Sequence, residues 1–249
     1  MARQARKESS TGIFHVMMRG INHQNIFEEP EDYYQFIATL DRMRVHYDED
    51  GSPSGINCTY YAYCLMSNHF HLLIREREER VVETIKRIAG SYVYYYNRKH
   101  GRDGHLFKER FKSEPVNDMS YFTTLLRYIH QNPVKAGIVE HVREYEFSSW
   151  GEYDGSVDSV FQICDTATVL RRKPYELLND LIGGFVCTND RELAASLLQK
   201  ETFLKVKNGR NDWRTSIVRG LRQCAAFNMQ VVNAMRDPFN LRPINGGGS

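Results

Sequence analysis

The sequence predicts an α+β fold in which an antiparallel sheet carries its helices on one face. Three observations support this class. Strand-like apolar runs occur near the start of the chain and again from residue 57. Segments with helical periodicity separate and follow these runs. Two polar residues divide the second run into two strands, and this order of elements is typical of α+β domains with an antiparallel sheet.

The first expected strand is Ile13–Arg19, an apolar run that Gly20 and a polar turn close. A helix is expected to begin at Pro30, because proline and acidic residues are typical of a first helical turn. Four apolar residues of this helix recur on one face: Tyr34, Ile37, Leu40 and Met43. Residues 48–55 are rich in Gly, Ser and Pro, and they are expected to form a loop.

The second apolar run resolves into strands at 57–66 and 69–75, which Ser67 and Asn68 separate. Apolar residues at helical spacing then predict a helix over 81–98. A further helix is expected over 118–130. Asn132-Pro133 should end this helix, because proline has no N–H with which to continue the hydrogen-bond ladder.

The chain has 249 residues, which is enough for one substantial domain and a smaller region. We expect the first domain to span 1–155, with its boundary at Asp154-Gly155-Ser156. Residues 156–245 are rich in helical periods and predict a mostly helical extension, with DNA binding and packing as its two candidate roles. The terminal Gly-Gly-Gly-Ser at 246–249 is expected to be a flexible tail.

The composition indicates a cellular compartment but does not identify a binding partner. Net charge is only +2, and no apolar run approaches the length of a membrane span. The five cysteines are scattered without a CxxC pair, which favours reduced thiols in a cytosolic protein. Basic residues gather in one segment and suit either a solvated loop or a single-stranded DNA surface: Arg98, Lys99, Arg102, His105, Lys108, Arg110 and Lys112.

His69-Phe70-His71 is the clearest candidate for a metal-binding motif. Residues i and i+2 of a strand project to the same face, so the two imidazoles stand side by side while Phe70 packs on the other face. Neutral imidazole is a common ligand for divalent ions. Taken alone, however, the pattern favours the alternative of two surface histidines on an exposed sheet face.

Tyr128 and Asn132 lie four residues apart on the last expected helix, so they share one face of it. A tyrosine beside a metal site is a candidate nucleophile, because a nearby cation helps the phenol to ionise. The amide oxygen of Asn132 could complete the metal ligands. In the alternative, Tyr128 is a core aromatic and Asn132 a helix cap, and spacing alone favours that alternative.

Five stretches together carry a resemblance to a known family. They are His15 to Gly20 (HVMMRG), Met66 to Leu73 (MSNHFHLL), Gly104 to Ser113 (GHLFKERFKS), Tyr128 to Gly137 (YIHQNPVKAG) and Phe147 to Trp150 (FSSW). In this order they resemble the single-tyrosine transposases of the IS200/IS605 type, within the HUH endonuclease superfamily. The nearer likeness is to the REP-associated tyrosine transposase branch, and it covers roughly residues 12–153.

The resemblance implies a ferredoxin/RRM-like HUH core and a role for each motif residue. His69 and His71 match the metal-binding pair, and Tyr128 matches the nucleophile that becomes joined to a DNA 5′ end. Asn132 falls at the third metal ligand, where many relatives carry glutamine, and Gln131 is the second candidate for that place. The family's ion is Mg²⁺ or Mn²⁺, and two imidazoles with an amide oxygen favour Mn²⁺ or another transition ion.

The resulting expectation is a metal-dependent transposase or endonuclease that cleaves and rejoins single-stranded DNA at hairpin-forming repeats, through a 5′-phosphotyrosine. The setting it implies is a bacterial-type cytoplasm and nucleoid, with no membrane partner, and both monomer and homodimer stay open. A rolling-circle replication initiator or relaxase-type nickase is the alternative within enzymes. A domesticated, noncatalytic DNA-binding protein and a structural zinc protein are weaker alternatives, because DNA binding needs no such residue set and no fourth zinc ligand is evident.

Overall fold

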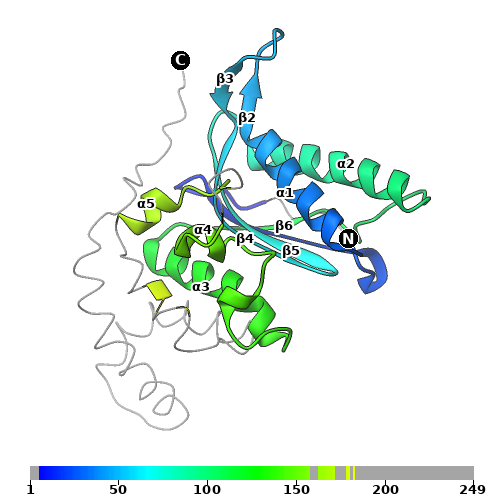
Figure 1. The fold of residues 1–249 in the computed structure, drawn as a ribbon. Coiled ribbons are helices and arrows are strands. Elements are labelled where there is room, and N and C mark those ends of the chain that lie inside the picture. Colours follow the sequence, from blue (N-terminus) through cyan, green and yellow to red (C-terminus); the bar gives the residue numbers. More distant parts are fainter. Residues whose placement is uncertain (1–5, 158–161, 172–177, 180–181, 183–249) are drawn as a thin grey trace. The chain divides into compact units, whose positions relative to one another are not determined.

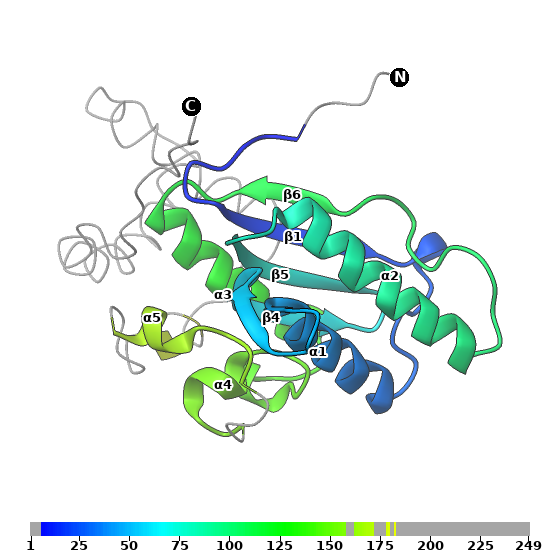
Figure 2. The same cartoon turned by 90° about the horizontal axis from the view of Figure 1, so that it is seen from above.

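The computed structural model describes residues 6–157, 162–171, 178–179 and 182. A four-stranded antiparallel sheet with the order β4-β5-β1-β6 forms its centre (Figures 1 and 2). Helix α1 (Pro30–Arg44) links β1 (Ile13–Arg19) to the β4–β5 pair, and α2 (Val81–Lys99) links β5 to β6. The other strands are β4 (Cys58–Met66), β5 (His69–Glu76) and β6 (Lys112–Pro115). This βαββαβ order confirms the predicted α+β class and its ferredoxin-like core.

The helices cover both faces of the sheet rather than one. Phe70 packs against Phe36 of α1, with ring centroids 4.8 Å apart, whereas the next residue, His71, packs against Tyr128, with ring centroids 5.5 Å apart. Successive residues of a strand face opposite ways, so α1 and α2 cover one face and α3 (Met119–Lys135) covers the other (Figure 1). The expectation of helices on one face therefore holds for the two crossover helices only.

Helix α3 continues through Pro133 to Lys135, so the prediction that Asn132-Pro133 ends it was wrong. Proline cannot donate to the carbonyl of Ile129, four residues earlier. The Asn132 side chain supplies the missing donor: its Nδ2 lies 3.3 Å from the Ile129 carbonyl oxygen and 2.9 Å from that of Tyr128. The residue before the proline thus satisfies the carbonyl that the proline leaves without its usual donor.

Two strand regions have no clear signal in the sequence. Residues 53–55 of the expected loop at 48–55 belong to a strand: β2 (Val45–Tyr47) and β3 (Pro53–Ile56) form a small hairpin, and residues 48–52 are its turn. Strand β6 has the sequence Lys-Ser-Glu-Pro, without apolar alternation, because it is an edge strand that pairs only with β1. The basic segment therefore ends in a sheet strand rather than in a loop.

The chain after α3 packs back onto β4. Two short helices follow η2 (Val142–Glu144), namely α4 (Trp150–Asp154) and α5 (Thr166–Leu170). Backbone N–H groups of Ile163 and Cys164 donate to the buried Glu152 carboxylate, so packing continues beyond residue 155, where a boundary was expected. Most of the predicted helical extension and the whole of the predicted tail lie outside the described residues. No helix in the described part of the chain is long and apolar enough to cross a membrane.

His130 joins α3 to this returning segment by a hydrogen bond. Because the His130 ring is buried, we expect the protein to lose stability in acid. The ring lies 2.8 Å from the Leu126 carbonyl oxygen through Nδ1 and 2.8 Å from the Ser149 hydroxyl through Nε2. Burial lowers the pKa of His130 from 6.5 to about 4. The unfolded chain therefore takes up this proton first, and the stabilisation, about 3 kcal/mol, is present above pH 6.5 and lost as the pH falls to 4.

Urea unfolding across this pH range tests the assignment. We expect His130→Gln to be less stable than wild type at neutral pH and to lose less stability between pH 6.5 and pH 4. His46 is exposed on β2, so His46→Gln should follow the wild-type profile. Parallel profiles for wild type and His130→Gln would rule out this role.

Candidate active site on the α3 face of the sheet

The two histidines of the motif stand on the sheet face that α3 covers. In the register of β5 against β1, His69 lies opposite Arg19 and His71 opposite Met17. The side chain of His71 is buried and that of His69 is partly exposed. Their ring centroids are 5.2 Å apart. The structure thus brings the pair together at the end of the sheet, with the more exposed ring at the outer position.

Each ring uses its Nδ1 in a hydrogen bond. His69 Nδ1 lies 2.6 Å from Asn68 Oδ1, and an amide oxygen can only accept, so His69 donates. His71 Nδ1 lies 2.9 Å from Nε2 of His15, a histidine of β1. In both rings, Nδ1 is thus already engaged, which leaves Nε2 as the nitrogen that takes no part in this bond.

The surroundings keep both histidines in the neutral form that binds metals. Burial, and to a smaller extent the nearby Arg19 charge, lowers the pKa of His69 to about 4. Burial, followed by the charges of His15 and His69, lowers the pKa of His71 well below its ordinary value. Neutral imidazoles at neutral pH need no deprotonation before an ion binds.

Tyr128 of α3 meets His71 of this pair edge-on. Its ring lies at 90° to that of His71, and its centroid is 6.0 Å from that of His15. Lys135, two turns later on the same helix, holds its ammonium group 4.3 Å from the centroid of the Tyr128 ring. Tyr128 is 8% exposed, so it is a core aromatic, as its spacing alone favoured. Its ring nevertheless lies next to the rings of His71 and His15.

Of the two candidates for a third ligand, Asn132 suits the place better. Its amide nitrogen is used within α3, and its Oδ1 is an acceptor on the same face as Tyr128. Gln131 is fully buried, its Nε2 donates to the Ile182 carbonyl, and Arg127 donates to its Oε1 over 3.4 Å. The amide of Gln131 is therefore committed to packing.

The donor set fits a divalent first-row ion. His69 and His71 each present one imidazole nitrogen, and Asn132 can add an amide oxygen. Magnesium prefers an all-oxygen set, whereas manganese accepts nitrogen as well, so the chemistry of these side chains favours Mn²⁺. Neutral histidines with their Nδ1 groups already engaged are suited to receive it.

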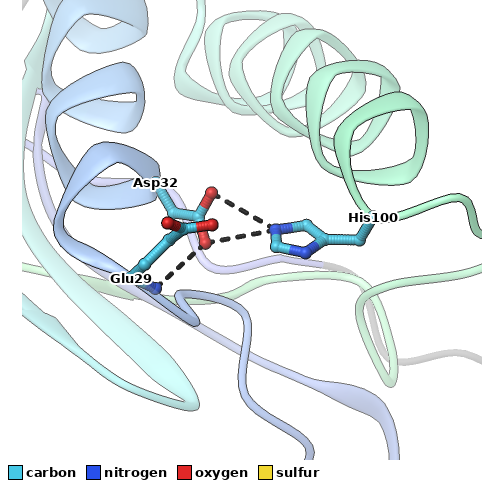
Figure 3. Close-up of side chains that lie close together, drawn as sticks. All are labelled: Glu29, Asp32 and His100. Atoms are coloured by element: carbon cyan, nitrogen blue, oxygen red, sulfur yellow. Dashed lines mark hydrogen bonds and ion pairs between the residues drawn. The ribbon is translucent and has the colours of Figure 1, made fainter.

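A second group of possible ligands, Glu29, Asp32 and His100, has a structural role (Figure 3). Asp32 is buried in the first turn of α1 and accepts from the Glu28 backbone N–H over 2.8 Å. The Lys99 ammonium group already provides the cation, at 2.9–3.1 Å from three carboxylates: Glu29, Glu31 and Asp32. Burial alone would raise the pKa of Asp32, but these hydrogen bonds lower it below its ordinary value. The group joins α1 to the end of α2.

The residues of the basic segment divide into held and exposed side chains. Lys99 is held by these carboxylates, and Arg102 donates to Gln24 Oε1 over 3.1 Å. Arg98 is exposed at the end of α2. Four others are exposed between α2 and the end of β6: His105, Lys108, Arg110 and Lys112. Lys112 lies opposite Met17, which in turn lies opposite His71.

The sequence alone assigned no role to four residues near the histidine pair. They are His15 and Arg19 on β1, Glu114 on β6 and Lys135 on α3. His15, Arg19 and Lys135 fall within motifs that carry the family resemblance, which was the available signal. Glu114 gave none, because its strand has no apolar pattern.

Comparison with known proteins identifies a matching family model and similar proteins. Residues 10–132 match the family model described as "Transposase IS200 like". A Haemophilus influenzae protein described as a REP-associated tyrosine transposase is 25% identical over 149 residues, which span 52% of this chain and 85% of that protein. A solved REP-associated tyrosine transposase bound to a REP hairpin is 16% identical, with a TM-score of 0.49 over 67% of this chain and 93% of that one. The family match includes His69, His71, Tyr128 and Asn132.

Proposed function

We propose that this chain, which belongs to the IS200-like transposase family through residues 10–132, cleaves and rejoins single-stranded DNA through Tyr128. One observation carries the proposal. The Tyr128 ring of α3 lies 5.5 Å from the ring of His71, on the sheet face where His69 and His71 present Nε2. A tyrosine next to two neutral histidines is the arrangement that a metal-assisted nucleophile needs.

The chemistry assigned to the chain is a phosphoryl transfer. The Tyr128 phenol loses its proton and attacks the phosphorus, the bond to the 3′ oxygen breaks, and that oxygen takes up a proton. The product is a 5′-phosphotyrosine and a free 3′ hydroxyl, and attack by a 3′ hydroxyl reverses the step. A divalent ion held by His69, His71 and Asn132 would offset the negative charge on the phosphate. Tyr128 lies beside the histidines of its own chain, which supports cleavage within one protomer.

We assign the single strand to the exposed basic residues at the β6 edge, with hairpin-forming repeats as the target. Lys108 pairs with its neighbour Glu109 over 4.0 Å, and within the described part of the chain no network like that around Lys99 holds Lys108, Arg110 or Lys112. The H. influenzae relative is named for its association with REP sequences, which supports repeats as the DNA target. This activity places the protein on DNA in a bacterial-type cytoplasm.

Covalent capture tests the function. The full-length protein is incubated with Mn²⁺ and a library of single-stranded oligonucleotides that carry a hairpin and randomised flanks. We expect a denaturation-resistant adduct that contains the 3′-labelled fragment, with the label mapped to Tyr128 by peptide analysis. Cleavage without any adduct would contradict the proposal. Adducts only with a rolling-circle origin would favour the replication-initiator alternative.

Salt dependence tests the basic surface. Replacing Lys108, Arg110 and Lys112 together by glutamine removes three charges that we expect to contact phosphates. Each phosphate contact contributes about 0.7 to the slope of log affinity against log salt for single strands, so the slope should fall by about 2. Lys86, on α2, is exposed and paired with Glu83, so Lys86→Gln is the matched control. An unchanged slope in the triple variant, measured by fluorescence anisotropy, would place the DNA elsewhere.

Lys135 is expected to favour the ionised form of Tyr128. Its ammonium group, 4.3 Å from the ring centroid, stabilises negative charge on the phenol oxygen as it attacks. Lys135→Met should slow strand cleavage about 10²-fold. Binding to a hairpin oligonucleotide should change far less, and Lys86→Met controls for the loss of charge. Single-turnover cleavage as fast as in wild type would show that Tyr128 needs no help from Lys135.

A further inference from the structure

We infer that His15 is a positioning residue for His71 and that Glu114 orients His15, so that the three side chains determine which nitrogen of His71 can bind an ion. The part of this inference that concerns metal binding rests on the proposed function. The part that concerns the proton on His71 does not, because it follows from side-chain contacts within the protein alone.

The three side chains form a row across three neighbouring strands. Glu114 lies opposite His15 in the pairing of β6 with β1, and His15 lies diagonally across from His71 in the pairing of β1 with β5. The two imidazole planes are 13° apart, and His15 Nε2 lies 2.9 Å from His71 Nδ1. At the other end of the row, His15 Nδ1 lies 3.9 Å from Glu114 Oε2.

The direction of each proton follows from the chemistry of the groups. A carboxylate only accepts, so the proton of a neutral His15 belongs on Nδ1, which faces Glu114. Nε2 of His15 is then an acceptor, and His71 must donate to it from Nδ1. The lone pair of His71 is left on Nε2. The opposite tautomer of His15 would place a proton on Nε2 of His71 and block that nitrogen.

Packing holds the row in this order. His15 is 8% exposed and His71 is 2% exposed, so water offers these rings little alternative to the bond between them. Tyr121 donates to Oε2 of Glu114 over 2.8 Å, which keeps the carboxylate at the end of the row. His15 is therefore more than a filler of the core beneath Tyr128.

His69 reaches the same state by a different route. Its Nδ1 donates to the side-chain oxygen of Asn68, the preceding residue, so its lone pair is also on Nε2. Two different acceptors, the Asn68 amide and the His15 ring, thus give both histidines of the motif one tautomer. Acceptors of this kind orient metal-binding histidines, and their loss typically weakens metal affinity about 10- to 100-fold.

The tautomer can be read directly in the metal-free protein. Long-range ¹H–¹⁵N correlation spectra of full-length, histidine-labelled protein at mildly alkaline pH should show a protonated Nδ1 and an unprotonated Nε2 for His71. His15→Phe keeps a ring but removes both nitrogens, so His71 should become a mixture of tautomers. Calorimetry with Mn²⁺ should show binding about 10- to 100-fold weaker than in wild type.

Two further variants and one control keep the test independent of folding. Glu114→Gln, at the exposed edge of the sheet, should shift the His71 tautomer in the same direction but less. His15→Gln offers an amide oxygen to His71 Nδ1, so it should restore part of the wild-type tautomer of His71 and part of the Mn²⁺ affinity. Glu83→Gln, a carboxylate change in an exposed pair on α2, should leave both unchanged.

Each result decides a separate point. An unchanged His71 tautomer in both His15→Phe and Glu114→Gln overturns the inference. The same holds if Mn²⁺ affinity falls while the tautomer stays as in wild type, because His15 would then act as a ligand itself. If wild type binds no Mn²⁺ but the tautomers respond as described, the metal site of the proposed function fails and the positioning of His71 stands.

Discussion

Tyr128→Phe is expected to abolish strand cleavage and the covalent protein–DNA adduct, with a loss of about 10⁴-fold or more. Removing a nucleophile from a site whose other groups act only through it has an effect of this size. The substitution keeps the ring, and with it the edge-on contact to His71 and the Lys135 ammonium above the ring. Affinity for a hairpin oligonucleotide should therefore change by no more than about twofold, because phosphate contacts dominate binding.

A second tyrosine provides the control. Tyr94 is on α2 and is 69% exposed, so Tyr94→Phe removes the same hydroxyl from the surface and should cleave like wild type. Single-turnover assays with end-labelled oligonucleotides measure both variants. Adduct formation by Tyr128→Phe at the wild-type rate would show that another side chain attacks the phosphate, and it would remove the central assignment of the proposed function.

The sequence was sufficient for the parts of the fold that bury a regular apolar face. Strands β1, β4 and β5 and helices α1 and α2 were predicted within one or two residues, because Phe70, Leu72 and Ile74 alternate with residues of the other face and α2 repeats at helical spacing. The same alternation placed His69 and His71 on one face. What alternation could not tell is which helix covers that face.

The missed features depend on contacts between distant residues. Strand β6 exists because β1 offers it a partner, and its own residues carry no pattern. Helix α3 passes Pro133 because the side chain of Asn132 donates to Ile129, a local substitution that a rule about proline does not include. Lys99 was counted with the DNA-binding residues because its sequence neighbours are basic, whereas the structure shows ion pairs to Glu29, just before α1, and to Asp32 in its first turn.

The site shows the same division between local and distant information. His69 with His71, and Tyr128 with Asn132, are pairs at fixed spacing within one element, so the sequence could pair them. The approach of α3 to β5 joins the two pairs, and only the three-dimensional structure shows it. His15 contacts His71 across strands, 56 residues away in sequence, and no spacing rule reaches that far.

Removing either histidine of the motif is expected to have the second large effect. His71→Ala deletes one imidazole ligand and also leaves His15 Nε2 without the donor it has in the folded protein. Metal-dependent cleavage should fall at least about 10³-fold, since one ligand and the charge that the ion offsets at the phosphate are lost together. His69→Ala should show the same loss of cleavage with a smaller loss of stability, because His69 is partly exposed whereas His71 is 2% exposed.

Three measurements separate the loss of metal from general damage. Calorimetry with Mn²⁺ should show no binding by His69→Ala, while hairpin affinity and the far-ultraviolet circular dichroism spectrum match wild type. Wild type treated with EDTA should cleave as slowly as this variant, and His46→Ala, at an exposed position on β2, should cleave normally. Equal cleavage by wild type with and without EDTA would contradict a metal role for the pair. It would leave Tyr128 to be activated by Lys135 alone, the group that lies 4.3 Å from its ring centroid.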